Sequence, residues 1–180
     1  DIPVSVLAPQ SLDDIMAAML PLGEMTGHQA DAQAVVDDMQ ARIAAVQEKV
    51  DRIRLEQRVT VFYEVWHDPL TTTSDATFIG ELLALAGGIN IFGELEGSYP
   101  NVSDEQIIIR DPQVIVGPSS HSEQLTSEQL ATRPGWGDLR AVQNDAVYII
   151  DGDIISRPGP RVVEALEALA ALFYPESFAD

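Results

Sequence analysis

The segment VTVFYEVW, residues 59–66, carries the strongest strand signal in the chain, because β-branched and aromatic side chains crowd it and a turn-forming Asp-Pro pair follows at 68–69. Downstream, helix and strand patterns alternate to the last residues. The expected elements are a helix at 74–86 ended by Gly87-Gly88, a strand at 89–92, a helical turn capped by Ser103 and Gln106, a strand at 114–117, a short helix near 136–142, a strand at 147–150 and a helix at 160–174. This alternation predicts an α/β fold, with a mostly parallel sheet and helices on both faces.

Upstream of this strand lies one long amphipathic pattern. Its apolar residues recur at steps of three and four, at Val35, Met39, Ile43, Val46, Val50 and Ile53. They predict a single helix from about residue 29 to 56, on the order of 40 Å long at 1.5 Å per residue, which suits a strut between two lobes. A coiled-coil or bundle helix is the alternative, although the apolar stripe is not sustained in heptads beyond this segment.

The first 28 residues predict a buried strand at 2–7 and then a helix. The helix starts at the capping pair Ser11 and Asp14 and stops near Pro21 and Gly23. A strand that opens a chain has no earlier strand to pair with, and the chain begins at Asp1 without a methionine or a signal-type apolar run. We therefore expect a processed protein or an excised fragment.

Composition excludes several classes of function. The chain has 180 residues, 46% of them hydrophobic, and a net charge of -19, so it is predicted to fold and to repel nucleic acid and anionic membrane surfaces. It contains no cysteine, which excludes disulfides, thiolate zinc sites and cysteine nucleophiles. No apolar run is long enough to span a membrane.

The carboxyl ends of the predicted strands deliver a set of polar and aromatic side chains to one edge of the sheet, where ligands of such sheets bind. The set consists of Trp66, Thr71, Tyr99, Asp153 and Arg157. An aromatic pair, a hydroxyl, a carboxylate and an arginine form a plausible binding rim for a bulky ligand.

The pentapeptide RPGPR, residues 157–161, places two of only ten basic residues at the start of the last helix. A helix N-terminus and two guanidinium groups suit a carboxylate, a phosphate or an amide-bearing ligand, while capping of backbone carbonyls is the alternative. We expect Arg157, four residues after Asp153, to contact ligand, and Arg161, in the first helical turn, to be structural.

Enzyme and metal motifs are weak. His67, Asp68 and Ser119 or Ser120 could be read as a hydrolase triad, but no GxSxG elbow is present. Phosphate-binding glycine motifs for dinucleotides or P-loop nucleotides are absent as well. The three histidines, His28, His67 and His121, lie in separate loops, so no metal site is predicted.

Taken in order, these segments resemble the C-terminal half of class III substrate-binding proteins of ABC importers, the group that handles cobalamin, ferric siderophores and haem. The resemblance is carried by PLGEMTG, the long helix, VFYEVWHDPLTTTSDATFIGELLALAGGINIF, YPNVSDEQIIIRDPQVIVGP, GWGDLRAVQNDAVYIIDGD, and RPGPR with its helix. It implies two lobes bridged by one long helix, with ligand held between them. Residues 1–28 would then be the remnant of an N-terminal lobe, 29–57 the interlobe helix and 58–180 the C-terminal α/β lobe.

The resemblance also implies roles for individual residues. Aromatic or apolar ligand contacts fall at Thr71 and Tyr99 and polar contacts at Asp153 and Arg157, with Trp66 nearby by the strand argument. Cobalamin binders tend to have a ring in place of Thr71 and an aromatic pair after the aspartate, where this chain has Ile154-Ile155. A siderophore or haem therefore remains a candidate, and Tyr63, His67 or Tyr99 could serve as an axial haem ligand.

In this family, each lobe presents a surface glutamate that forms ion pairs with arginines of the permease. Glu105 in SYPNVSDEQ matches that glutamate. Its alternative role is to complete the first turn of a capped helix. The resemblance thus implies a non-enzymatic, monomeric solute-binding protein outside the cytoplasm, with or without a lipid anchor, that has no cofactor and no catalytic residue. The alternatives are an α/β enzyme or cofactor-handling domain of chelatase-like or nitrogenase-like architecture, or an interaction domain without a small ligand.

Overall fold

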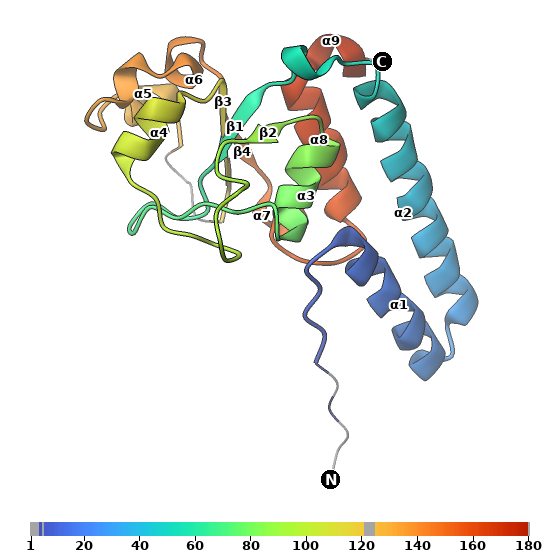
Figure 1. The fold of residues 1–180 in the computed structure, drawn as a ribbon. Coiled ribbons are helices and arrows are strands. Elements are labelled where there is room, and N and C mark those ends of the chain that lie inside the picture. The colour runs from blue at the N-terminus through green and yellow to red at the C-terminus, as the bar shows by residue number, and fades with distance from the viewer. Residues whose placement is uncertain (1–3, 5, 121–124, 180) are drawn as a thin grey trace.

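The computed structural model describes residues 4, 6–120 and 125–179. Within these residues, four parallel strands form one sheet in the order β2-β1-β3-β4. The strands are β1 (Thr60–Tyr63), β2 (Ile89–Asn90), β3 (Val114–Pro118) and β4 (Val147–Ile150). The α/β fold with a parallel sheet flanked by helices is thereby confirmed (Figure 1).

The two faces of the sheet are covered by different helices. Because side chains alternate along each strand, neighbouring strand residues pack against opposite sets of helices. Val61 and Tyr63 of β1 point into a core with helices α3 (Phe78–Leu85) and α8 (Val162–Phe173). Phe62 points to the opposite face. There it meets α4 (Asp104–Arg110), α5 (Ser127–Leu130), α6 (Arg140–Gln143) and the 3₁₀ turn η2 (Trp136–Asp138).

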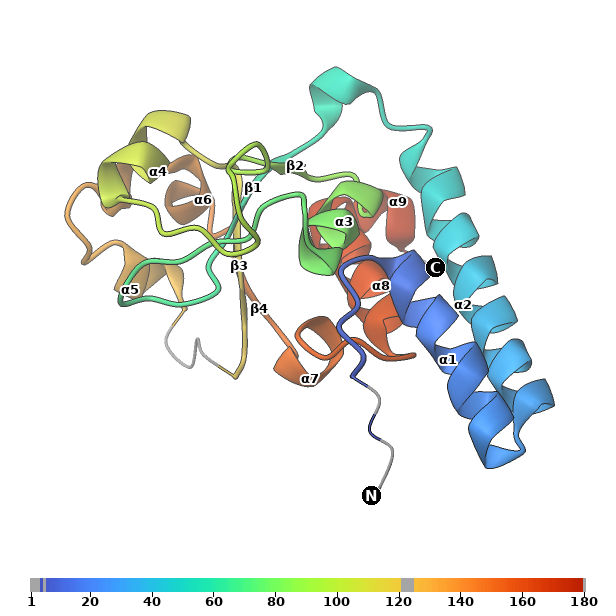
Figure 2. The ribbon, with the colours of Figure 1, turned by 60° about the horizontal axis from the view of Figure 1, so that its bottom comes forward.

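Helices α1 (Leu12–Thr26) and α2 (Gln29–Val50) form an antiparallel pair beside α8, on the side of the sheet away from α4 to α6 (Figure 2). The guanidinium of Arg42 in α2 donates two hydrogen bonds to the Glu167 carboxylate of α8, at 2.8 and 2.6 Å. The long helix therefore packs against α8 and is joined to it by this ion pair. Among the described residues, no helix combines the length and apolar character needed to cross a membrane.

The predictions for the N-terminal segment were partly wrong. Of the predicted strand at 2–7, Val4, Val6 and Leu7 are described; they are exposed and form no strand, since no neighbouring strand offers backbone partners. Residues 2, 3 and 5 lie outside the described residues. Helix α1 continues through Pro21 and ends at Gly27, whose φ of 77° is the left-handed conformation that ends a helix.

The long helix and the first strand are shorter than expected. Helix α2 ends at Val50, whose carbonyl accepts a hydrogen bond from the Ile53 N–H in a turn that redirects the chain towards β1. A 3₁₀ turn, η1 (Leu55–Gln57), follows. Strand β1 ends at Tyr63; the Glu64 N–H still bonds to Val116 of β3, but the N–H groups of Val65 and Trp66 bond to the Thr71 carbonyl instead.

Three predicted helices also differ in their bounds. Thr77, not Ser74, caps α3, because the backbone and hydroxyl of Ser74 bond to the loop at 97–98. A single helix at 136–142 is replaced by η2 and α6. Helix α8 begins at Val162, after a turn in which the Val162 N–H bonds to the Gly159 carbonyl. The remaining short α-helices are α7 (Gly152–Ile155) and α9 (Pro175–Phe178).

Candidate functional site

Two loops run side by side at the carboxyl edge of the sheet. The loop after β1 folds back so that the Thr71 N–H donates to the Trp66 carbonyl at 2.9 Å, and Thr71 also pairs with Asn101 of the loop after β2. The Thr71 hydroxyl donates to Pro69 O at 2.8 Å and lies 2.9 Å from Asn101 Oδ1. The predicted residues Trp66 and Thr71 are therefore neighbours, and the Thr71 hydroxyl is used to hold the two loops together.

Tyr63 precedes the loop that follows β1. It is the last residue of β1 and fully buried, and its hydroxyl has no hydrogen-bond partner among the described residues. Burial is the main reason that the pKa of Tyr63 is raised, and the Tyr99 side chain raises it further. The Ser156 side chain lowers this pKa, although no hydrogen bond of standard geometry joins the Tyr63 and Ser156 hydroxyls. Tyr99 is 46% exposed, and partial burial raises its pKa too.

The third side of the site is the segment that follows β4. The Asp151 side chain caps α7 by accepting from the Asp153 N–H at 2.8 Å. Arg157 then reaches back to Asp153, with 2.9 Å between Nη2 and Oδ1, and the two side chains are 75% and 53% exposed. Ser156, beside Arg157, and Tyr99 both act on the pKa of Tyr63, so the segment after β4 and the Tyr99 loop both lie near that residue.

The isoleucine pair that departs from the cobalamin binders does not face this surface. Ile154 and Ile155 of α7 are buried in the core that contains Tyr63 and α8. Arg161 occupies the cap position before α8 and makes no side-chain capping bond there. Its predicted structural role stays a prediction.

A buried ion pair anchors the loop after β1. Glu64 follows Tyr63, and its carboxylate accepts two hydrogen bonds from the Arg133 guanidinium, one of them at 2.9 Å. Their side chains are only 4% and 17% exposed, and Arg133 also lies over the Trp136 ring at 4.5 Å. Sequence reasoning missed this pair, although a lone glutamate inside VFYEVW was a usable signal, since an unpaired carboxylate is not kept in a core.

Glu105 lies in the first turn of α4 and is exposed. The capping box predicted for Ser103 and Gln106 is present, with both of its hydrogen bonds formed. A hydrogen bond from the Ser103 side chain is the main cause that lowers the pKa of Glu105, and its own backbone amide contributes. The carboxylate is thus charged at neutral pH and available on the surface.

The histidines have no shared site among the described residues. His67 is exposed, His28 pairs with Asp31, and His121 lies outside the described residues. Within residues 6–120 and 125–179, no three His, Asp or Glu side chains converge to hold a metal ion.

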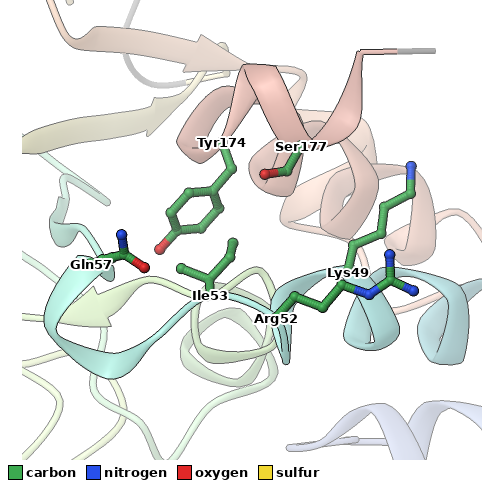
Figure 3. Close-up of a pocket in the computed structure, with 6 residues that line it drawn as sticks. All are labelled: Lys49, Arg52, Ile53, Gln57, Tyr174 and Ser177. Atoms are coloured by element: carbon green, nitrogen blue, oxygen red, sulfur yellow. The ribbon is translucent and has the colours of Figure 1, made fainter.

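A separate surface cavity of about 420 Å³ lies at the opposite, amino end of the sheet. Figure 3 shows Lys49 and Arg52 of the α2 terminus at this cavity, with Tyr174 and Ser177 on the other side. The Tyr174 hydroxyl accepts from the Val59 N–H just before β1, which fixes the cavity at the amino edge. It is therefore distinct from the loops that gather at the carboxyl edge.

The fold and the carboxyl-edge loops define a ligand-binding α/β lobe attached to a long helix. Comparison with known sequences and structures gives the family. The sequence profile of the periplasmic binding protein family matches residues 1–154, and the chain belongs to this family.

Individual relatives agree with this assignment. The chain is 31% identical over 170 residues to an uncharacterised ABC transporter substrate-binding lipoprotein, YvrC, of Bacillus subtilis, covering 94% of this chain and 52% of the relative. It is 30% identical over 158 residues to a vitamin B12-binding protein of Vibrio cholerae, covering 88% and 55%. The crystal structure of a possible iron-binding periplasmic solute-binding protein of Staphylococcus epidermidis superposes with a TM-score of 0.81 at 28% identity, covering 95% and 66%. The chain thus spans about half the length of the curated relatives it matches.

Proposed function

We propose that this chain is the ligand-holding lobe of a solute-binding protein of an ABC importer, which captures cobalamin or an iron chelate such as a ferric siderophore or haem. The observation that supports this most is at the carboxyl edge, where Thr71 joins the loops after β1 and β2, and the Asp153–Arg157 pair follows β4. Aromatic faces and a single ion pair suit a large, mostly flat ligand with polar groups at its periphery.

A second lobe is part of this proposal, because the relatives are about twice as long as this chain. The cleft would lie between the two lobes, with α2 as the connection, and the division into residues 1–28, 29–57 and 58–180 stays a prediction. We expect a monomer that works outside the cytoplasm.

A binding screen tests this function. The full-length protein and the 180-residue chain are titrated in parallel with cyanocobalamin, haemin and a ferric hydroxamate siderophore by equilibrium dialysis. We expect one probe to bind the full-length protein at a 1:1 ratio and to be recovered chemically unchanged. Conversion of the probe would favour the enzyme alternative, and failure of all three probes to bind would contradict the proposal.

Delivery to a permease through Glu105 is a second part of the proposal. The side chain is exposed and charged at the first turn of α4, as an ion pair with a permease arginine requires. Glu128 occupies the same position in the first turn of α5 and is also exposed, which makes Glu128→Ala the matched control. We expect Glu105→Ala to reduce transporter-stimulated ATP hydrolysis and Glu128→Ala to leave it unchanged. Equal rates for both variants and the wild type would remove the docking role.

A further inference from the structure

The Tyr63 hydroxyl is a buried polar group at the edge of the candidate site. Tyr63 is fully buried, and its Oη has no hydrogen-bond partner among the described residues. A buried hydroxyl without a partner loses its hydrogen bonds to water and gains nothing in exchange, so such groups are rare in folded proteins. At an internal core position, phenylalanine would avoid this loss of stability. Tyr63 instead lies at the end of β1, at the carboxyl edge of the sheet.

Exposed side chains border this hydroxyl. The two side chains that interact with it, Tyr99 and Ser156, both lie on the exposed surface of the site. Tyr99 comes from the loop after β2 and Ser156 from the end of α7, so the hydroxyl lies where two walls of the site meet.

The Tyr99 side chain can turn without opening the loop that carries it. The residues on either side are fixed to the loop after β1, with the Thr72 N–H bonded to Pro100 O at 3.0 Å and the Ser74 N–H to Ser98 O at 3.1 Å. Movement of Tyr99 is thereby confined to rotation of its half-exposed ring. Rotation about side-chain bonds at a surface is fast and inexpensive compared with loop opening.

We propose that Tyr63 is a ligand-contact residue of the cleft, whose hydroxyl donates a hydrogen bond to a carbonyl or carboxylate oxygen at the periphery of the bound chelate once the Tyr99 ring turns away. This inference rests on the proposed function and adds to it a specific polar contact. Because burial raises the pKa of Tyr63, the phenol stays protonated and acts as a donor. Ligands that carry amide, hydroxamate or carboxylate oxygens at their edges satisfy this requirement.

Tyr63→Phe tests the contact, because it removes one oxygen and keeps the ring. We expect the dissociation constant for the probe that binds best in the screen to rise about 3- to 10-fold, more if the acceptor is a carboxylate. The thermal midpoint of the empty protein should stay the same or rise, because an unpaired hydroxyl is lost. An unchanged dissociation constant, or a lowered midpoint in the empty protein, would overturn the proposal.

Tyr174→Phe is the matched control. Its hydroxyl donates to the Gly87 carbonyl at 2.8 Å and accepts from the Val59 N–H at 3.1 Å, at the far end of the sheet. We expect this variant to show the reverse pattern, with a lower thermal midpoint and an unchanged dissociation constant.

A measurement without ligand decides the role of Tyr99 independently of the screen. Wild type and Tyr99→Ala are treated with tetranitromethane, and nitration of Tyr63 is followed by peptide mass spectrometry. We expect Tyr63 to be protected in the wild type and nitrated at least 10-fold faster in Tyr99→Ala. Equal rates would show that Tyr99 does not cover the hydroxyl and would refute the inference, whereas failure of every probe to bind would count against the proposed function alone.

Discussion

Replacement of Arg133 by methionine tests how the loop after β1 is held at the site. The change keeps most of the side-chain volume and removes the guanidinium that binds Glu64 through two hydrogen bonds. Because the Glu64 side chain is only 4% exposed, its charge would be left buried without a partner. Breaking such a pair costs about 3–5 kcal/mol, a large part of the ~5–15 kcal/mol by which domains are stable.

This cost is measured by urea unfolding followed by far-UV circular dichroism. For a chain of this length it corresponds to a fall in the thermal midpoint of about 6–20 °C. Arg52→Met is the control, because Arg52 pairs with Glu48 on the surface, where both side chains are more than 70% exposed, and should lose less than about 1 kcal/mol.

A second variant separates the unpaired charge from lost packing. In the double variant Glu64→Leu, Arg133→Met no buried charge remains, and we expect it to recover at least about 2 kcal/mol relative to Arg133→Met. The reasoning is refuted if Arg133→Met costs less than about 1 kcal/mol, or if the double variant is no more stable than the single one.

Two further predictions concern stability. The Arg42 guanidinium holds the pKa of Glu167 below its ordinary value of 4.5, so the pair stabilises the fold above that pH and its contribution is lost as the pH falls through the lower folded value. In urea titrations at several pH values, Arg42→Met should therefore be less stable than wild type at neutral pH, by less than about 1 kcal/mol because Glu167 is 42% exposed. The two proteins should converge as the pH falls below 4.5 through the lower folded pKa, and a constant difference would contradict this. Gly87 and Gly97 share a positive φ, of 85° and 86°, but a Cβ at Gly87 would lie 2.9 Å from the Tyr174 ring, while Gly97 has open space. Gly87→Ala should cost at least about 1 kcal/mol more than Gly97→Ala in the same assay, and equal losses would show that the tight contact is unimportant.

The architecture could be predicted because its signals are local. The apolar run of β3 and the amphipathic face of α8 are properties of neighbouring residues, and the capping box at Ser103 needs only three residues to be recognised. Element ends were less accurate where tertiary contacts compete with local signals, as at Ser74, whose hydroxyl bonds to the Gly97 carbonyl. Pro21 is a second example: the local sequence predicts that the helix ends there, but α1 continues to Thr26, where it packs against α2.

The candidate site was predictable only in part, for a related reason. Parallel topology alone brings the ends of β1 and β4 to one edge, so Trp66 and Arg157 could be assigned to the same region. The contacts beneath them join distant segments. Glu64 and Arg133 are 69 positions apart, and nothing in the local sequence around either residue names the other. Tyr63 was recognisable as a strand residue, but its unpaired hydroxyl is a property of the folded chain.

The proposed ligand surface is tested most directly by comparing two arginines in the full-length protein. Arg157 and Arg52 are about equally exposed, and each pairs with a carboxylate four positions earlier in the sequence, but Arg157 lies at the carboxyl edge and Arg52 at the amino-edge cavity. With the probe identified by the screen, we expect Arg157→Ala to raise the dissociation constant at least about 10-fold, as loss of a charge-assisted hydrogen bond does, and Arg52→Ala to leave it unchanged. Equal affinities of both variants and the wild type, or a larger loss for Arg52→Ala, would contradict the assignment of the ligand to the carboxyl edge.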